Sequence, residues 1–186
     1  TPKKGDFLYK ALNGDGVIDD NDKYAVGHGL APRLTYGFSL GAEWNGFDFS
    51  CLFQGNAGLQ VYWQDKFYMG YINYGDVINK EIAEGAWREG RTNATYPRLL
   101  TGLNTLNAQP SDFWVQNKSY LRLKNVQIGY KIPKKLLQKL DISQLRLYTS
   151  LENMLTFTSY KGIDPEISGT TYPTMKQITV GVNVVF

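Results

Sequence analysis

The chain has 186 residues, of which 42% are hydrophobic and 14% aromatic, and its formal net charge is only +3. It contains no run of about 18 apolar residues, which excludes a transmembrane helix, and no long basic stripe, which argues against a nucleic-acid partner. The single cysteine, Cys51, and the single histidine, His28, exclude an internal disulfide and argue against a metalloenzyme. We interpret Cys51 as a small apolar residue and His28 as a loop residue.

Residues 1–32 are predicted to form a loop that contains an Asp-rich turn. Alternate oxygen-bearing residues around a glycine suit a hard cation, so the turn resembles a calcium-binding loop. With Ala11 taken as its first position, the candidate ligands are Asn13, Asp15, the Val17 carbonyl, Asp19 and Asp22. Ala11 lacks a side-chain oxygen, and the alternative is a turn whose carboxylates accept local N–H groups. Ca²⁺ is the one candidate cofactor.

Residues 33–56 are predicted to form a β-hairpin. In 33–44, apolar residues occupy every second position and small or polar residues occupy the rest, which is typical of a strand with one buried face. At about 3.3 Å per residue, such a strand is long enough for a tilted bilayer crossing. Asn45-Gly46 then predicts a two-residue turn, and the alternation resumes from Phe47.

Residues 57–117 are predicted to form a long loop, with a short helix near 76–87 where apolar residues recur at helical spacing. The early part of the loop is rich in aromatic residues, which suit stacking on sugar rings or contact with a partner protein. These candidates are Tyr62, Trp63, Phe67, Tyr68 and Tyr71. The alternative is that they form an interfacial aromatic belt and pack within the loop.

Residues 118–186 are predicted to supply three strands, at 118–132, 144–156 and 175–186, with a short helical turn after Pro133. The apolar face of the first strand switches partway, which predicts either a β-bulge near Lys124–Asn125 or a twisted strand that leaves the membrane. The last strand ends on an aromatic residue, Phe186.

The connection 157–174 between the last two strands contains Asp164 and Glu166 on either side of Pro165. Two neighbouring carboxylates suggest general acid–base chemistry. We prefer the interpretation that they are solvated carboxylates of a turn, because no glycine-rich phosphate loop, catalytic triad or paired-Asp signature accompanies them.

Short and long connections alternate along the chain, which is typical of an antiparallel up-and-down β-barrel whose long loops lie on the outer side of a membrane. The predicted fold class is therefore all-β: an antiparallel transmembrane β-barrel fragment with long extracellular loops. Five strands cannot close a barrel in lipid, because their edges would stay unpaired. Either further strands complete the barrel, or the sheet does not lie in a membrane.

Several sequence blocks resemble the SusC/RagA family of TonB-dependent outer-membrane transporters. The blocks are NGDGVIDDND (13–22), GFDFS (46–50), FQG (53–55), YPRL (96–99), PSDFW (110–114), SYLRLKNV (119–126), LRLY (145–148), ENMLT (152–156) and GIDPE (162–166). Their order and spacing match along nearly the whole chain, which looks like the C-terminal part of such a transporter.

The resemblance implies a barrel of about 22 strands, of which this chain supplies five or six, together with an N-terminal plug. It implies TonB-dependent import of glycan oligomers or peptides across the outer membrane, beneath a lid formed by a SusD-like lipoprotein. The plug, which contacts the TonB complex, does not lie within these residues. The chain would form barrel wall and outer loops in contact with outer-membrane lipid, and Phe186 would be the barrel-assembly signal.

Two other functions remain open at this stage. One is a soluble, calcium-dependent, β-rich surface binding module, which predicts solubility without detergent. The other is a hydrolase, for which the sequence offers no catalytic set. We therefore predict a transporter fragment that is not an enzyme.

Overall fold

The computed structural model describes residues 2–27, 29, 31–62, 78, 80–99, 106–138, 141–167 and 171–186. The chain divides into two compact units. The loop unit comprises Thr1–Gly27 and Val61–Gln116, and the sheet unit comprises His28–Gln60 and Asn117–Phe186. The predicted loop residue His28 lies outside the described residues.

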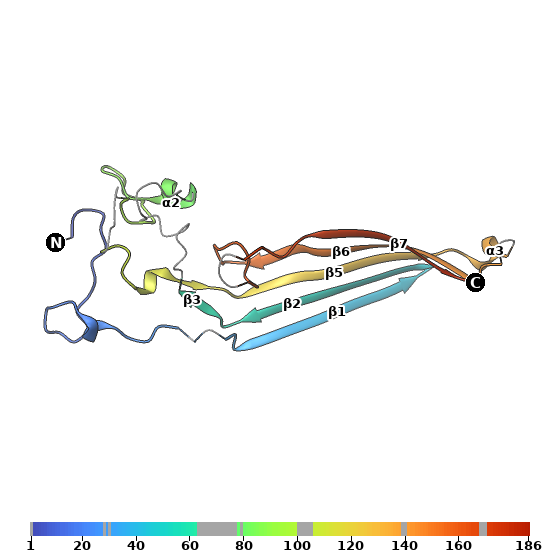
Figure 1. Cartoon of the computed structure of the whole chain (residues 1–186), viewed down its shortest axis with the longest axis horizontal. Helices are drawn as coiled ribbons and strands as arrows, with labels where there is room; N and C mark the ends of the chain where they lie inside the picture. Colours follow the sequence, from blue (N-terminus) through green and yellow to red (C-terminus); the bar gives the residue numbers. More distant parts are fainter. Residues whose placement is uncertain are drawn as a thin grey trace. The chain divides into compact units, whose positions relative to one another are not determined.

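The sheet unit is built around a five-stranded sheet in the order β1-β2-β5-β6-β7, in which all neighbouring strands are antiparallel (Figure 1). The strands are β1 (Leu34–Trp44), β2 (Phe47–Ala57), β5 (Tyr120–Lys131), β6 (Gln144–Thr158) and β7 (Gln177–Val185). The predicted helical turn after Pro133 is α3 (Lys134–Leu137). The five strands and their antiparallel arrangement confirm the prediction from alternation. Among the helices that the structure describes, none is long and apolar enough to cross a membrane.

The β1–β2 connection is the predicted two-residue turn. Asn45 and Gly46 have φ angles of 48° and 85°, and Trp44 pairs directly with Phe47. Two consecutive left-handed residues match the twist of the flanking strands, and Asn-Gly tolerates that conformation at low cost.

The register aligns apolar residues into rows across one face of the sheet, here called the apolar face. One row contains Leu40, Cys51, Val126, Leu151 and Ile178. The next row on the opposite, polar face contains Gly41, Ser50, Gln127, Ser150 and Thr179. Large side chains of the apolar face are exposed, such as Leu40 at 58% and Val180 at 80%, whereas the small Cys51 is buried among its neighbours. An exposed apolar face of this size calls for a nonaqueous neighbour.

The predicted bulge is confirmed at Lys124. Leu52 and Phe53 are consecutive in β2, but they pair with Asn125 and Leu123, so Lys124 is the extra residue of β5. Against β6 the register shifts at the same place, where Leu123 pairs with Leu155 and Asn125 with Glu152. A bulge lets consecutive residues serve the same side of a sheet. Lys124 and Asn125 use this to reach partners on the polar face, Glu166 and Ser150.

Within its described residues, the loop unit has short elements and a small core. It contains the 3₁₀ turns η1 (Asp20–Asp22) and η2 (Asp112–Trp114) and the helix α2 (Lys80–Gly85). The short strands β3 (Gln60–Tyr62) and β4 (Val115–Asn117) pair with each other. The core consists of Ile82, Tyr96 and Trp114, with Phe7, Tyr62 and Leu99 packed against it. The described part of the segment predicted as one long loop, 57–117, thus holds two short strands, a helix and a 3₁₀ turn. That helix is shorter than the predicted 76–87, of which 76, 77 and 79 lie outside the described residues.

Candidate functional site

The polar face of the sheet carries ion pairs in two clusters, and the first lies toward the β1–β2 turn. Arg146 of β6 donates from Nε to Asp48 Oδ1 of β2 at 2.9 Å and from Nη2 to Gln127 Oε1 at 3.0 Å. The pair crosses over β5 at Gly129, where an added Cβ would lie 2.5 Å from both Arg146 Nη2 and Asp48 Oδ2. Gly129 is therefore required by the space that this ion pair occupies rather than by its own backbone.

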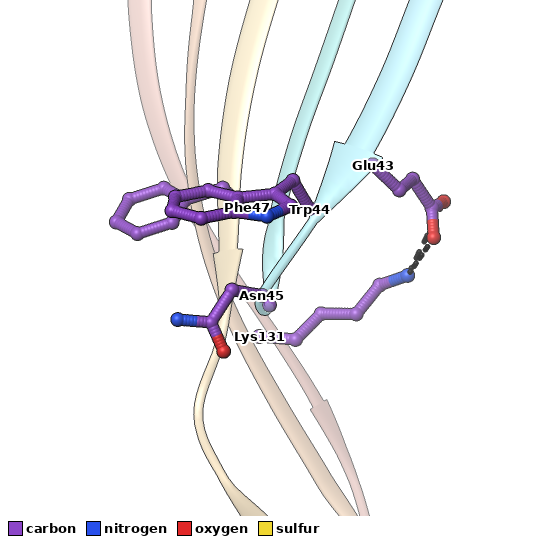
Figure 2. A pocket seen from close by; sticks show the side chains of 6 residues that line it. Glu43, Trp44, Asn45, Phe47 and Lys131 are labelled. Carbon is purple, nitrogen blue, oxygen red and sulfur yellow. Dashed lines mark hydrogen bonds and ion pairs between the residues drawn. The ribbon is translucent and has the colours of Figure 1, made fainter.

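Another, weaker ion pair lies at the β1–β2 turn itself. Lys131 Nζ is 3.4 Å from Glu43 Oε2, and these side chains are 42% and 73% exposed. Figure 2 shows them beside a small pocket whose other lining residues include Trp44 and Phe47. Exposed ion pairs of this kind contribute little to stability. The pocket is lined by one cation and one anion already paired to each other, and it offers no evident ligand chemistry.

The second cluster, which we call the Arg122 cluster, joins β5 to the connection between β6 and β7. Arg122 donates from Nη2 to Asp164 Oδ1 and from Nη1 to Glu166 Oε2, both at 2.7 Å, and from Nε to Thr156 Oγ1 at 2.8 Å. Lys124 Nζ donates to Glu166 at 2.7 Å. The Arg122 and Asp164 side chains are each only 5% exposed, so their charges are compensated almost entirely within the protein.

Asp164 also organises its own connection. Its Oδ1 accepts the Glu166 backbone N–H at 2.9 Å, and its Oδ2 accepts the Thr174 N–H at 3.0 Å. Burial by itself would raise the pKa of Asp164, but the hydrogen bonds from Arg122 and from these backbone groups outweigh it and lower the pKa. Asp164 is therefore a carboxylate that holds both limbs of the connection to β5.

The interpretation of Asp164 and Glu166 as solvated turn carboxylates is wrong. The side chains are 5% and 15% exposed, and both are neutralised by Arg122. The sequence contained one usable signal: alternation places Arg122 between Leu121 and Leu123, on the polar face of a strand. An arginine at such a position needs a carboxylate partner, but periodicity does not say which one.

The five candidate calcium ligands lie in one exposed turn of the loop unit, and the side-chain oxygens of Asn13, Asp15, Asp19 and Asp22 accept local hydrogen bonds. Asp22 Oδ1 accepts the Leu12 N–H at 2.6 Å, and its Oδ2 accepts the Asp19 N–H at 2.9 Å. Asp15 Oδ1 accepts the Val17 N–H at 2.7 Å. In the part of the chain that the structure describes, no group of three or more His, Cys, Asp or Glu side chains is arranged to hold a metal ion. These contacts match the alternative of a turn capped by its own carboxylates, and calcium binding stays a prediction.

The other predicted site residues are only partly visible. Tyr62 packs against the core of the loop unit, and burial raises its pKa. Trp63, Phe67, Tyr68 and Tyr71 lie outside the described residues. Phe186 is 88% exposed. Its carbonyl accepts a hydrogen bond from Ser143 Oγ at 3.3 Å, and its role in assembly stays a prediction.

The loop unit has a part-buried ion pair of its own, which the sequence did not predict; the Asp6 side chain is 4% exposed and the Arg98 side chain 22%. Arg98 donates to Asp6 from Nε at 2.6 Å and from Nη2 at 2.9 Å. Asn107 Nδ2 donates to the same carboxylate at 3.0 Å, and its Oδ1 accepts the Phe7 N–H at 2.8 Å. This network ties segments about a hundred residues apart in the sequence.

The Asp6 network predicts a pH dependence for the loop unit. The hydrogen bond from Arg98 is the largest cause that lowers the pKa of Asp6 from 3.8 to about 2. Because the folded pKa is depressed, the stabilisation is complete above about pH 4 and is lost as the pH falls through about 2. The stabilisation is at most about 2 kcal/mol, because solvent screens part of this pair.

Amide hydrogen exchange near Phe7 and Arg98 checks this expectation. At pH 5 these amides should exchange at least about tenfold more slowly in the parent protein than in Arg98→Met. The difference in exchange rate should shrink toward pH 2. Asp6→Asn has no titratable group at this position, so the protection of these amides in that variant should not show this pH dependence. A protection difference that stays constant from pH 5 to pH 2 would contradict the assignment.

No family model matches the chain, but individual proteins are similar to it. TonB-dependent receptor P3 of Formosa agariphila is 31% identical over 198 residues, which cover 98% of this chain and 19% of that protein. TonB-dependent receptor P39 of the same organism is 32% identical, with the same coverage of both chains. TonB-dependent receptor SusC of Bacteroides thetaiotaomicron is 26% identical and covers 96% of this chain and 17% of that protein.

Solved structures give the same result. The RagAB peptide importer in the open-open state is similar with a TM-score of 0.69 and 28% identity, covering 91% of this chain and 19% of that chain. A second structure, of the RagAB peptide transporter, has a TM-score of 0.70 and 29% identity and covers 90% of this chain and 19% of that chain. The chain thus spans about a fifth of the length of these relatives.

Proposed function

We propose, from the premise that this chain belongs to the SusC/RagA family of TonB-dependent receptors, that it is part of the wall of an outer-membrane importer. The observation that carries the proposal is the division of the sheet into two faces. The apolar face exposes large hydrophobic side chains along all five strands, and the polar face carries buried and half-buried ion pairs. In a membrane barrel these faces meet lipid and lumen respectively.

The substrate of the whole importer is proposed as peptides or glycan oligomers, taken up with energy from the TonB complex. Similarity to SusC and to the RagAB peptide importer supports this class of nutrient. A SusD-like lipoprotein is the proposed lid. None of these roles requires catalysis by the chain, and the relatives are named as receptors and transporters rather than enzymes.

The soluble calcium-dependent module is the weaker candidate. It would leave the apolar face in water, where exposed patches of this extent promote association. The carboxylates that it would need for calcium already accept backbone N–H groups of their own turn.

Nutrient uptake by cells that lack the full-length transporter tests the proposal. With a peptide mixture or a glycan as the limiting nutrient, deletion of the transporter and loss of TonB should each abolish uptake of the same nutrient, and the intact gene should restore it. The protein should require detergent for extraction from the outer membrane. Uptake that persists without TonB, or recovery of the protein in the soluble fraction without detergent, would overturn the proposal.

A further inference from the structure

Residues 164–167, which we call the strap, are attached to the β5 region at three successive basic residues. Lys118, just before β5, donates from Nζ to the Ile167 carbonyl. Arg122 binds the Asp164 and Glu166 carboxylates, and Lys124 binds Glu166 again. The strap belongs to the connection between β6 and β7, so these contacts fold that connection back over the sheet.

The strap lies on the polar face. Arg122 pairs in register with Gln54 of β2 and Thr156 of β6, in the row between those of the apolar Leu121 and Leu123. Given the proposed function, on which this step rests, the polar face borders the lumen. The connection therefore enters the lumen side of the wall instead of extending away from the sheet.

Burial and charge oppose release of the strap. Asp164 and Pro165 are buried, and Asp164 also holds the returning limb through the Thr174 N–H. Lifting the strap would separate Arg122, which is 5% exposed, from both of its carboxylates and would leave buried charges uncompensated. An exposed pair such as Lys131–Glu43 presents no such barrier.

We propose that the strap is a fixed part of the lumen wall, held by Arg122 in every state of the import cycle, and that it is not a moving lid. Substrate would then pass a surface that is already shaped at this level of the wall. Movements that admit or release substrate must occur in other elements.

Thiol labelling of the purified full-length transporter in detergent tests whether Arg122 holds the strap. In a Cys51→Ala background, Pro165→Cys places one thiol of this chain in the buried strap. We expect a maleimide to react with it slowly, and Arg122→Met to accelerate the reaction by about tenfold or more, because a buried residue reacts only when its segment opens. Equal rates in folded samples with and without Arg122→Met would overturn the proposal.

Arg146→Met is the matched control, because it removes the other polar-face arginine pair and leaves the strap contacts intact. It should leave the labelling rate of the Pro165→Cys variant unchanged. If Arg122→Met does not assemble, as judged by heat-modifiable electrophoretic migration, Asp164→Asn replaces it. That variant keeps the side-chain shape but loses the charge, and it should accelerate labelling in the same direction.

Cross-linking tests whether the strap moves during import. Lys124→Cys with Glu166→Cys, joined by a short thiol cross-linker, fixes the strap to β5 while the Arg122–Asp164 pair remains. Import by the cross-linked transporter should equal that of the two single-cysteine variants treated alike, and loss of import only in the linked protein would overturn the proposal. Failure of the proposed function would show separately, as absence of import by the untreated parent, and it would not affect the labelling result.

Discussion

Deleting Ser50 from the middle of β2 is expected to abolish assembly of the folded barrel. Side chains alternate between faces, so losing one residue moves half of the strand to the opposite face. If the half next to the turn moves, Asp48 enters lipid and Arg146 loses its carboxylate. A carboxylate on the lipid face near a strand end costs less than the roughly 2–4 kcal/mol of a basic residue at the midplane, so the larger cost is that of leaving Arg146, which is 13% exposed, without its carboxylate.

The other half of β2 offers no easier solution. Moving it would carry Gln54 and Asn56 to the apolar face and Phe53 to the polar face. Total stabilities are roughly 5–15 kcal/mol, so either slip removes a large share. The measurement is the amount of heat-modifiable folded protein in the outer-membrane fraction, compared with the parent at equal expression.

Deleting Lys124 is the control, because it removes a residue that already stands outside the β2–β5 register. Asn125 and Leu123 would become neighbours and would pair with consecutive residues of β2 without a change of face. This deletion should therefore retain far more folded protein than deletion of Ser50, although it loses the contact with Glu166. Equal loss in the two variants would show that alternation across the sheet does not decide assembly.

The same alternation explains why the sheet could be predicted from the sequence. Each strand meets two different environments, so apolar and polar residues alternate along it with a period of two. This alternation can be recognised without knowing which strands are its neighbours. The face switch between Leu123 and Val126 revealed the bulge for this reason. Asn45-Gly46 revealed the turn because few other residue pairs tolerate two positive φ angles.

The ion pairs could not be predicted in this way, because their partners are joined only by the fold. Arg122 and Asp164 are 42 positions apart, and Asp6 and Arg98 are 92 apart. No local pattern distinguishes a buried carboxylate from a solvated one in a Gly- and Pro-containing loop. Gly129 is a related case, because the Asp48–Arg146 pair that crosses it comes from the two neighbouring strands.

The Asp-rich turn was ambiguous for a different reason. A calcium loop and a turn capped by its own carboxylates require the same residue types at the same short spacings. The contacts of Asp15 and Asp22 with backbone N–H groups are visible only in the structure. Sequence alone could locate this turn but could not say what its oxygens bind.

The environment of the apolar face is tested most directly by a single charge. Leu40→Arg should lower the free energy of unfolding in phospholipid vesicles by about 2–4 kcal/mol, because Leu40 is 58% exposed in a central row of the apolar face. Ser39→Arg, one residue away on the polar face, should change it by much less, since an arginine there meets the lumen. Urea titration of both variants in the full-length transporter gives the comparison.

The contrast between these neighbours matters more than either value, because the two substitutions introduce the same charged side chain into the same strand. A soluble sheet with its apolar face packed on another domain would also be damaged by Leu40→Arg, but detergent or lipid would then have no special effect on its stability. In the barrel, the stability penalty of an arginine on the apolar face should fall as the substituted position moves from Leu40 toward the strand end at Trp44. There the arginine side chain can reach the interface. A penalty that does not vary along β1 would place the apolar face against protein, and the wall assignment would fail.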